Sequence, residues 1–135
     1  MTTVLSIFGL CYLFVWCFVG LYLGFKHESH SEALESSAKE GNLADYFGIW
    51  STWKMHAGAH AHALLLALIC IAVALLMPQI GLADTAKNIL GILLIVGTIL
   101  ASISHWFYFR PLLALGSIMF LIAVLMTLIG FIKGL

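Results

Sequence analysis

Four long runs of apolar residues dominate the chain, and polar residues gather between the first run and the second. The runs cover residues 4–25, 56–80, 86–109 and 111–132. An α-helix rises about 1.5 Å per residue, so about 20 apolar residues cross a hydrocarbon layer of about 30 Å. Backbone groups in hydrocarbon are satisfied only in helices or closed barrels, and no run alternates with the period of a barrel strand. The pattern predicts an all-α, polytopic membrane protein with four transmembrane helices in an antiparallel bundle, forming a single domain over residues 1–135.

The polar and interfacial segment 26–55 separates the first two predicted spans and holds five of the six acidic residues. Its residues 29–32, Ser-His-Ser-Glu, fit a helix N-cap with a carboxylate reaching back, and Gly41 fits a helix end. Trp50 and Trp53 follow in a stretch too short to cross a bilayer, and tryptophan favours the headgroup level. The segment therefore predicts a short interfacial helix between the first and second spans.

Composition and charge agree with this pattern and exclude several classes of protein. Hydrophobic residues make up 63% of the chain and charged residues only 9%, whereas a soluble domain has about 25% charged residues. The formal charge is zero and Lys and Arg form no cluster, which excludes the electrostatic footprint of a nucleic-acid binder. Four Lys or Arg lie on the side of segment 26–55 and two on the other side. The positive-inside rule therefore favours the histidine-rich side as cytoplasmic, and we expect the protein to lie in the inner membrane of the cell.

The six histidines all fall on one side of the predicted membrane. At about 100° per residue, His56 and His60 share a stripe with alanines, and His105 lies over the Gly, Ala, Ser and Thr of segment 86–109. Small residues mark helix contacts in membranes, so these three imidazoles are expected to point inward. His62 lies about 160° from His60 and is expected to point to lipid or to a partner. His60 and His105 lie at similar depth in their predicted spans, so we expect their side chains to face each other.

Two inward imidazoles on different helices are the ligand set of a b-type heme. The predicted axial ligands are His60 and His105, and Arg110 is expected to bind the heme propionates through charge-assisted bonds. The corresponding function is electron transfer, alone or in a redox complex, with quinone or a redox subunit as the partner.

A bare Cu, Zn or Fe ion is the alternative cofactor, because imidazole suits all three metals. Its predicted ligands are His27, His56, His60 and His105. The metalloprotease motif H-E-x-x-H is absent, since Ala57 follows His56. The pattern assigns no catalytic residue.

A third hypothesis gives the chain no chemistry of its own. In that case it is an accessory subunit of a larger membrane complex, or a homo-oligomer, and His62, Trp50 and Trp53 are the expected contacts. The inward histidines would then serve only as interfacial anchors and packing residues.

Residues 60–66, His-Ala-His-Ala-Leu-Leu-Leu, open a predicted membrane helix after an aromatic segment. This opening resembles the H-x-H helix starts of small four-helix membrane proteins distantly related to the catalytic subunit of heme-copper oxidases. The resemblance implies heme or metal ligation by histidines on helices and membership of a respiratory assembly. The chain lacks the further helices and the full ligand set of an oxidase subunit, so the resemblance does not extend to oxygen chemistry.

Overall fold

The computed structural model describes all 135 residues and consists of four long α-helices and one short 3₁₀ helix. The α-helices are α1 (Thr2–Lys39), α2 (Leu43–Leu76), α3 (Asp84–Trp106) and α4 (Arg110–Gly134), and η1 (Met77–Gln79) follows α2. Each α-helix is long and apolar enough to cross a membrane. The predicted all-α fold with four such helices is therefore confirmed.

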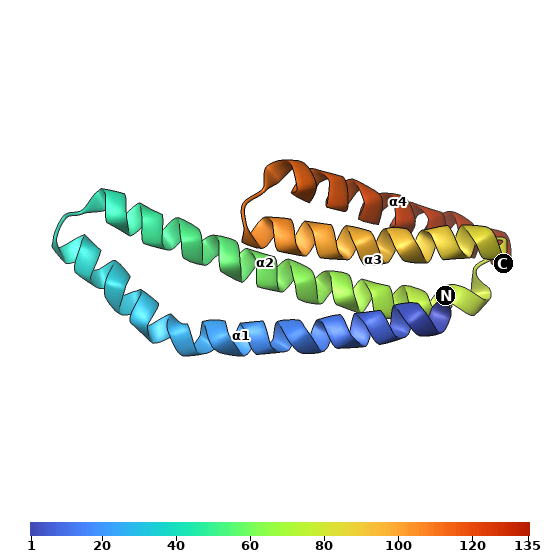
Figure 1. The fold of residues 1–135 in the computed structure, drawn as a ribbon, viewed down its shortest axis with the longest axis horizontal. Helices are drawn as coiled ribbons and strands as arrows, with labels where there is room; N and C mark the ends of the chain where they lie inside the picture. The colour runs from blue at the N-terminus through green and yellow to red at the C-terminus, as the bar shows by residue number, and fades with distance from the viewer.

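The four helices lie side by side in the order of the chain, with α2 and α3 on the inside (Figure 1). Consecutive helices run in opposite directions. Gly9 of α1 lies against Ile71 of α2, whereas Gly20 lies against His60, so sequence numbers rise along one helix as they fall along the other. α2 therefore has α1 on one side and α3 on another, and this arrangement fixes the neighbours of its side chains.

The first two helices are far longer than a bilayer requires. α1 contains 38 residues, whereas α3 contains 23 residues. At a rise of about 1.5 Å per residue, α1 extends about 57 Å and α3 about 35 Å. The surplus projects past the α3–α4 connection as a helical hairpin (Figure 1). We call residues 26–55 the polar hairpin, because it contains most of the charged residues of the chain.

The predicted separate interfacial helix is wrong, because the polar hairpin consists of uninterrupted continuations of α1 and α2. No proline lies before Pro78, so nothing in this stretch removes a helical hydrogen bond. The Ser31 hydroxyl donates to the carbonyl of His27 inside α1, at 3.0 Å, instead of helping to start a new helix. A serine that bonds back to the carbonyl four residues earlier is compatible with a continuous helix.

The helix end predicted at Gly41 is confirmed. Gly41 has a φ of +69°, a left-handed conformation that glycine adopts without steric cost. Asn42 then caps α2, since its side chain accepts a hydrogen bond from the Asp45 N–H at 3.2 Å. These two residues turn the chain and pair α1 with α2.

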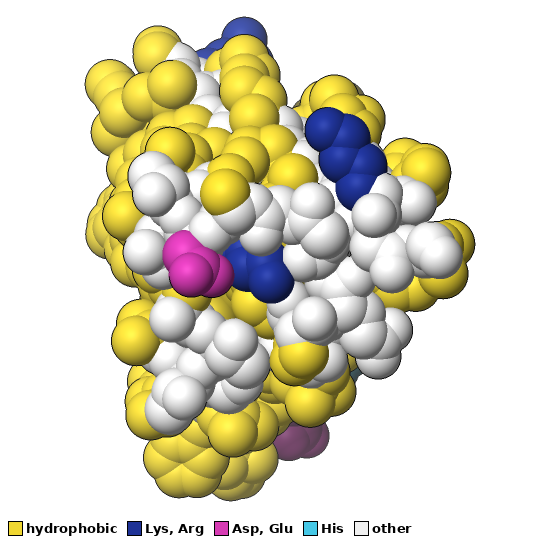
Figure 2. All heavy atoms as spheres, turned by 90° about the vertical axis from the view of Figure 1, so that its right-hand side faces the viewer, with side chains coloured by type: hydrophobic (Ala, Val, Ile, Leu, Met, Phe, Trp, Pro, Cys, Tyr) yellow, Lys and Arg dark blue, Asp and Glu magenta, His cyan; other side chains and the backbone are white.

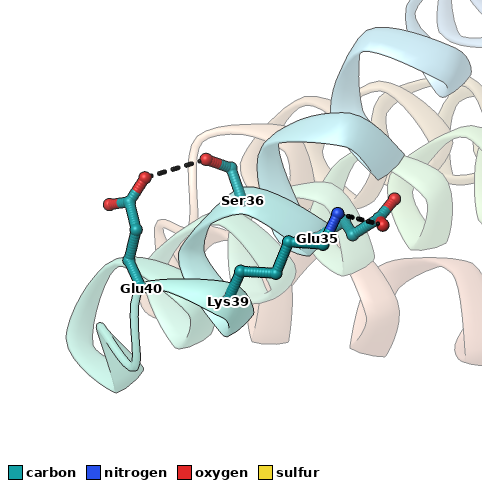
Figure 3. A network of polar contacts seen from close by, with 4 residues as sticks. All are labelled: Glu35, Ser36, Lys39 and Glu40. Carbon is teal, nitrogen blue, oxygen red and sulfur yellow. Dashed lines mark hydrogen bonds and ion pairs between the residues drawn. The ribbon is translucent and has the colours of Figure 1, made fainter.

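The tip of the polar hairpin carries solvated polar contacts (Figure 3). Lys39 and Glu35 form an ion pair at 2.6 Å, and the Ser36 hydroxyl donates to Glu40 at 2.9 Å. Exposed pairs of this kind contribute little stability. Their presence marks the tip as a surface that contacts water.

The largest buried cluster lies at the opposite end of the helices, where the start of α1 meets α2, α3 and α4. The Gly81 N–H donates to the carbonyl of Gly130 at 2.8 Å and ties the α2–α3 connection to α4. Both termini lie at this end, which shows a few charged side chains among apolar ones (Figures 1 and 2). Large apolar side chains are exposed along α1 and α4, as expected of faces that contact lipid. The fully buried side chains of the cluster include Leu5, Cys70, Leu90 and Leu94.

Candidate histidine site

The structure divides the six histidines among three places, all toward the polar-hairpin end of the molecule. The pairs are His27 with His30, His56 with His60, and His62 with His105. Each pair has different neighbours, and these neighbours decide which pair is able to bind a ligand.

His60 lies in the interface between α1 and α2. A Cβ atom at Gly20 would stand 2.5 Å from the His60 Cε1, so this ring occupies the space that the glycine leaves. The Trp16 ring lies beside it, with 6.4 Å between centroids, and the buried Nδ1 of His60 has no hydrogen-bond partner. The predicted inward orientation of His60 is confirmed, and its partner helix is α1.

His56 packs on the same aromatic cluster. Its ring stacks on Trp106 with 4.1 Å between centroids and 16° between planes, and Trp106 contacts Trp16 at 5.9 Å. Stacking of this kind holds an imidazole in a fixed place by its face. His56 and His60 therefore take part in the packing of α1, α2 and α3.

His62 and His105 are arranged around Gly58. A Cβ atom at Gly58 would stand 3.2 Å from Nε2 of His105, so the glycine allows the ring of α3 to approach α2 closely. Nδ1 of His62 lies 2.8 Å from the Gly58 carbonyl oxygen. A carbonyl only accepts hydrogen bonds, so Nδ1 carries the proton, and Nε2 of the neutral ring keeps a lone pair. The two ring centroids are 5.0 Å apart, with 48° between the planes.

The structure therefore pairs His105 with His62, in contrast to the predicted pair of His60 and His105. Gly58 faces His105. His60 comes two residues later and points to nearly the opposite side of α2. A stripe of small residues gives the side of a helix that packs but not the neighbour it packs against, and α2 has α1 and α3 on different sides (Figure 1). The expected orientation of His62, toward lipid or a partner, agrees with its exposed side chain, and its ring also lies beside that of His105.

The four ligands predicted for a bare metal are not brought to one place. His27 lies in the polar hairpin, His56 and His60 pack on tryptophans, and His105 lies beside Gly58. No group of three or more His, Cys, Asp or Glu side chains is placed to hold a metal ion. A metal bound by His62 and His105 would need donors of another kind to complete its coordination.

A cavity of about 710 Å³ adjoins the pair of His62 and His105. Met55, a residue with a thioether sulfur, lines it, and no carboxylate does. The cavity is therefore suited to a soft or weakly charged occupant. Its lining residues are Trp50, Ser51, Lys54, Met55, Gly58, His62, His105 and Tyr108.

Arg110 lies at the connection between α3 and α4, next to this cavity. It donates a hydrogen bond to the Tyr108 hydroxyl at 2.5 Å, and its guanidinium lies 5.0 Å from the Tyr108 ring centroid. Tyr108 has a φ of +57°, in the left-handed region that residues other than glycine seldom adopt. This tight connection brings Tyr108, which sequence reasoning did not single out as a site residue, to the edge of the cavity.

The two tryptophans of the polar hairpin have different surroundings. Trp50 is 43% exposed, and Nζ of Lys54 lies 4.7 Å from the centroid of its ring. Trp53 stacks on His30 at 4.3 Å and approaches His27 at 5.7 Å. Partial burial, and to a lesser degree repulsion from His27, lower the pKa of His30 from its ordinary value.

Sequence reasoning missed Met55 and His30 as site residues, and it did not foresee that Gly58 faces His105. The available signal for Gly58 was its position four residues before His62, on the same helical face. His30 follows His27 by three residues and thus shares its face of α1, but its contact with Trp53 depends on the pairing of two helices.

Fold and site together define an all-helical protein with four helices able to cross a membrane and a pair of histidines between its two inner helices. No protein-family model, curated protein or solved structure matches the chain.

Proposed function

We propose that this protein binds a transition-metal ion in the membrane through His62 and His105, and serves in redox or metal-handling chemistry. The observation that carries the proposal is the pair of imidazoles around Gly58. The hydrogen bond from Nδ1 of His62 to the Gly58 carbonyl leaves Nε2 free to ligate. Such a bond to the second nitrogen is the usual support of a histidine that binds metal.

The spacing of the two rings supports ligation of one ion. A metal lies about 2.0–2.1 Å from an imidazole nitrogen, and that nitrogen lies about 1.1 Å from the ring centre. Two imidazoles at a tetrahedral ion therefore have centres about 5 Å apart. The observed separation of 5.0 Å fits that arrangement.

The surroundings favour monovalent copper. Imidazole and thioether donors suit Cu(I), and Met55 lines the cavity beside both histidines. Lys54 lines the same cavity and no carboxylate offsets its charge. A singly charged ion is repelled less by Lys54 than Zn²⁺ or Fe²⁺ is.

Heme b is a second proposal, and the cavity of about 710 Å³ next to both rings supports it. Arg110 donates to the hydroxyl of Tyr108, which lines this cavity, and is the proposed partner of the heme propionates. Axial imidazoles on opposite faces of a heme, however, have centres about 6 Å apart, given nitrogens about 2 Å from the iron. The rings of His62 and His105, at 5.0 Å, would have to separate to admit the heme.

One purification tests both cofactors. The full chain is isolated from cells supplied with copper and heme precursors, and its metal content and optical spectrum are measured. We expect close to one copper per chain, and we expect His62→Gln or His105→Gln to reduce the copper content about tenfold or more. His27→Gln changes the same residue type outside the site and should leave the copper content unchanged.

The outcomes separate the proposals. If the wild-type protein shows a Soret band that is lost in the His105 variant, the cofactor is heme and the copper proposal is wrong. A colourless protein without stoichiometric metal, from the wild-type chain as well as from the variants, would refute both.

An accessory role in a larger membrane complex is the proposal of a different class. The polar hairpin favours it, because this part of α1 and α2 projects beyond α3 and α4 (Figure 1). Crosslinking in native membranes, followed by purification of the chain, should then recover a defined partner subunit. A chain recovered without any partner would contradict this role. From the positive-inside rule we also propose that the polar hairpin lies on the cytoplasmic side of an inner membrane, and quinone is a redox partner to be tested.

A further inference from the structure

A second cavity, of about 490 Å³, lies between α1 and α2 in the polar hairpin. None of its 11 lining residues is Asp or Glu, although the hairpin contains most of the acidic residues of the chain. Two histidines and Lys26 are among the lining residues. Lys26 is the only Lys, Arg, Asp or Glu of the lining, so the cavity carries one cationic side chain and no carboxylate within an acidic segment.

The lining offers several hydrogen-bond donors. Lys26 carries an ammonium group, and Ser29 adds a hydroxyl. His30 adds an Nε2 atom that is buried and has no hydrogen-bond partner in the protein. A buried polar atom without a partner costs free energy, and a ligand that forms a hydrogen bond with it removes that cost. Stacking on Trp53 holds the His30 ring in place.

The depth of the cavity suggests where its ligand comes from. Tyr22 and Leu23 line one end and belong to the apolar span, whereas Lys26 and Ser29 lie just beyond it. The cavity therefore extends from the edge of the hydrocarbon into the headgroup layer. A ligand with an apolar tail and an anionic head fits both ends.

We infer that this cavity binds the phosphate ester of an anionic membrane lipid, with Lys26, Ser29 and His30 around the phosphoryl oxygens. A lysine near the membrane surface attracts anionic lipid. The absence of a lining carboxylate disfavours a cation, and the apolar end distinguishes a lipid from a soluble phosphate. The site is separate from the pair of His62 and His105, so either proposal stands or fails by itself.

The test compares retained lipids in the full chain. Wild-type protein is placed in nanodiscs with equal amounts of phosphatidylglycerol and phosphatidylcholine of the same acyl chains, and lipids that remain bound are counted by native mass spectrometry. We expect phosphatidylglycerol to be retained over phosphatidylcholine, and Lys26→Gln to reduce that preference about tenfold, the size of a lost charge-assisted hydrogen bond. Lys39→Gln removes the same charge at the hairpin tip and should reduce it less than about twofold.

A spectroscopic arm keeps the test independent of the variants. The ¹⁵N chemical shift of Nε2 in His30 of the wild-type protein is followed while phosphatidylglycerol or inorganic phosphate is added. A shift with the lipid alone supports the proposal, and a shift with inorganic phosphate as well would assign the site to phosphate from solution. Equal retention of the two lipids, together with an unchanged His30 signal, would overturn the proposal of a lipid-binding site.

Discussion

Two glycines of neighbouring helices each leave room for an imidazole. Gly20 of α1 receives the ring of His60, and Gly58 of α2 receives the ring of His105. Gly58 also supplies the carbonyl that orients His62. At the scale of single residues, the positions of the imidazole rings thus depend on where glycines leave space between the helices.

Gly20→Ala should destabilise the protein. The new Cβ atom would stand 2.5 Å from Cε1 of His60, and Trp16 lies beside that ring, so the ring or the helix must shift. Overpacking of this kind costs about 1–3 kcal/mol. The measurement is the free energy of unfolding in detergent, by denaturant titration.

Gly24→Ala is the matched control for this substitution. It lies one turn further along α1, and a Cβ atom there meets nothing within 4 Å. Alanine exceeds glycine in helix propensity by up to about 1 kcal/mol, so this variant should be as stable as the wild type or slightly more stable. Equal losses of stability in Gly20→Ala and Gly24→Ala would show that Gly20 and His60 are not in close contact.

Helix lengths and helix contacts belong to the scale of elements. α1 and α2 exceed α3 and α4 in length, and this excess produces the polar hairpin and its cavity. α3 and α4 pair through Gly97 and Gly116, where the two backbones approach each other closely. Small residues are the usual means of such an approach in membranes.

Gly116→Ala should weaken the α3–α4 pair. Its Cβ atom would stand 2.5 Å from the backbone nitrogen of Ala101, and a backbone atom cannot turn aside as a side chain does. The helices must move apart, at a cost of about 1–3 kcal/mol. Unfolding of the variant in detergent measures this cost.

Gly48→Ala serves as the control for the α3–α4 contact, because a Cβ atom at Gly48 of α2 meets nothing within 4 Å. Its free energy of unfolding should equal that of the wild type within about 1 kcal/mol. A Gly116 variant that unfolds no more easily than this control would show that α3 and α4 do not pack through these glycines.

The whole molecule has two chemically different ends. One end holds the polar hairpin, the six histidines and the α3–α4 connection, and the other holds both termini and the α2–α3 connection (Figure 1). We expect these ends to face opposite sides of a membrane, because each of the four α-helices is long and apolar enough to cross it once.

Cysteine labelling tests this topology in sealed vesicles. Cysteines at Glu40 and at Tyr108 should react with a membrane-impermeant maleimide from the same side, and a cysteine at Ala83 from the opposite side. The wild-type chain is the background control, because its native cysteines lie within helices that are able to cross the membrane. Labelling of positions 40 and 83 from the same side would contradict a topology with four membrane crossings. Vesicles of known orientation also test whether the histidine-rich side is cytoplasmic.

The sequence alone determined the number of helices able to cross a membrane, their apolar character and the turn at Gly41. These features depend on local properties: about 20 apolar residues require a helix in hydrocarbon, and glycine favours a left-handed turn. The sequence also indicated that His60 points inward, because small residues share its stripe. The same local patterns favoured a break near residue 29, but the helices of the polar hairpin support each other by pairing and continue through it.

Only the tertiary structure decided which histidines meet. A helical stripe gives the direction of a side chain around its own axis, but the neighbour on that side depends on how the helices are ordered in space. Because α2 lies between α1 and α3, His60 meets Gly20 on one side while His62 meets His105 on the other. Contacts between residues far apart in the chain follow from close packing at glycines, and no local pattern contains that information.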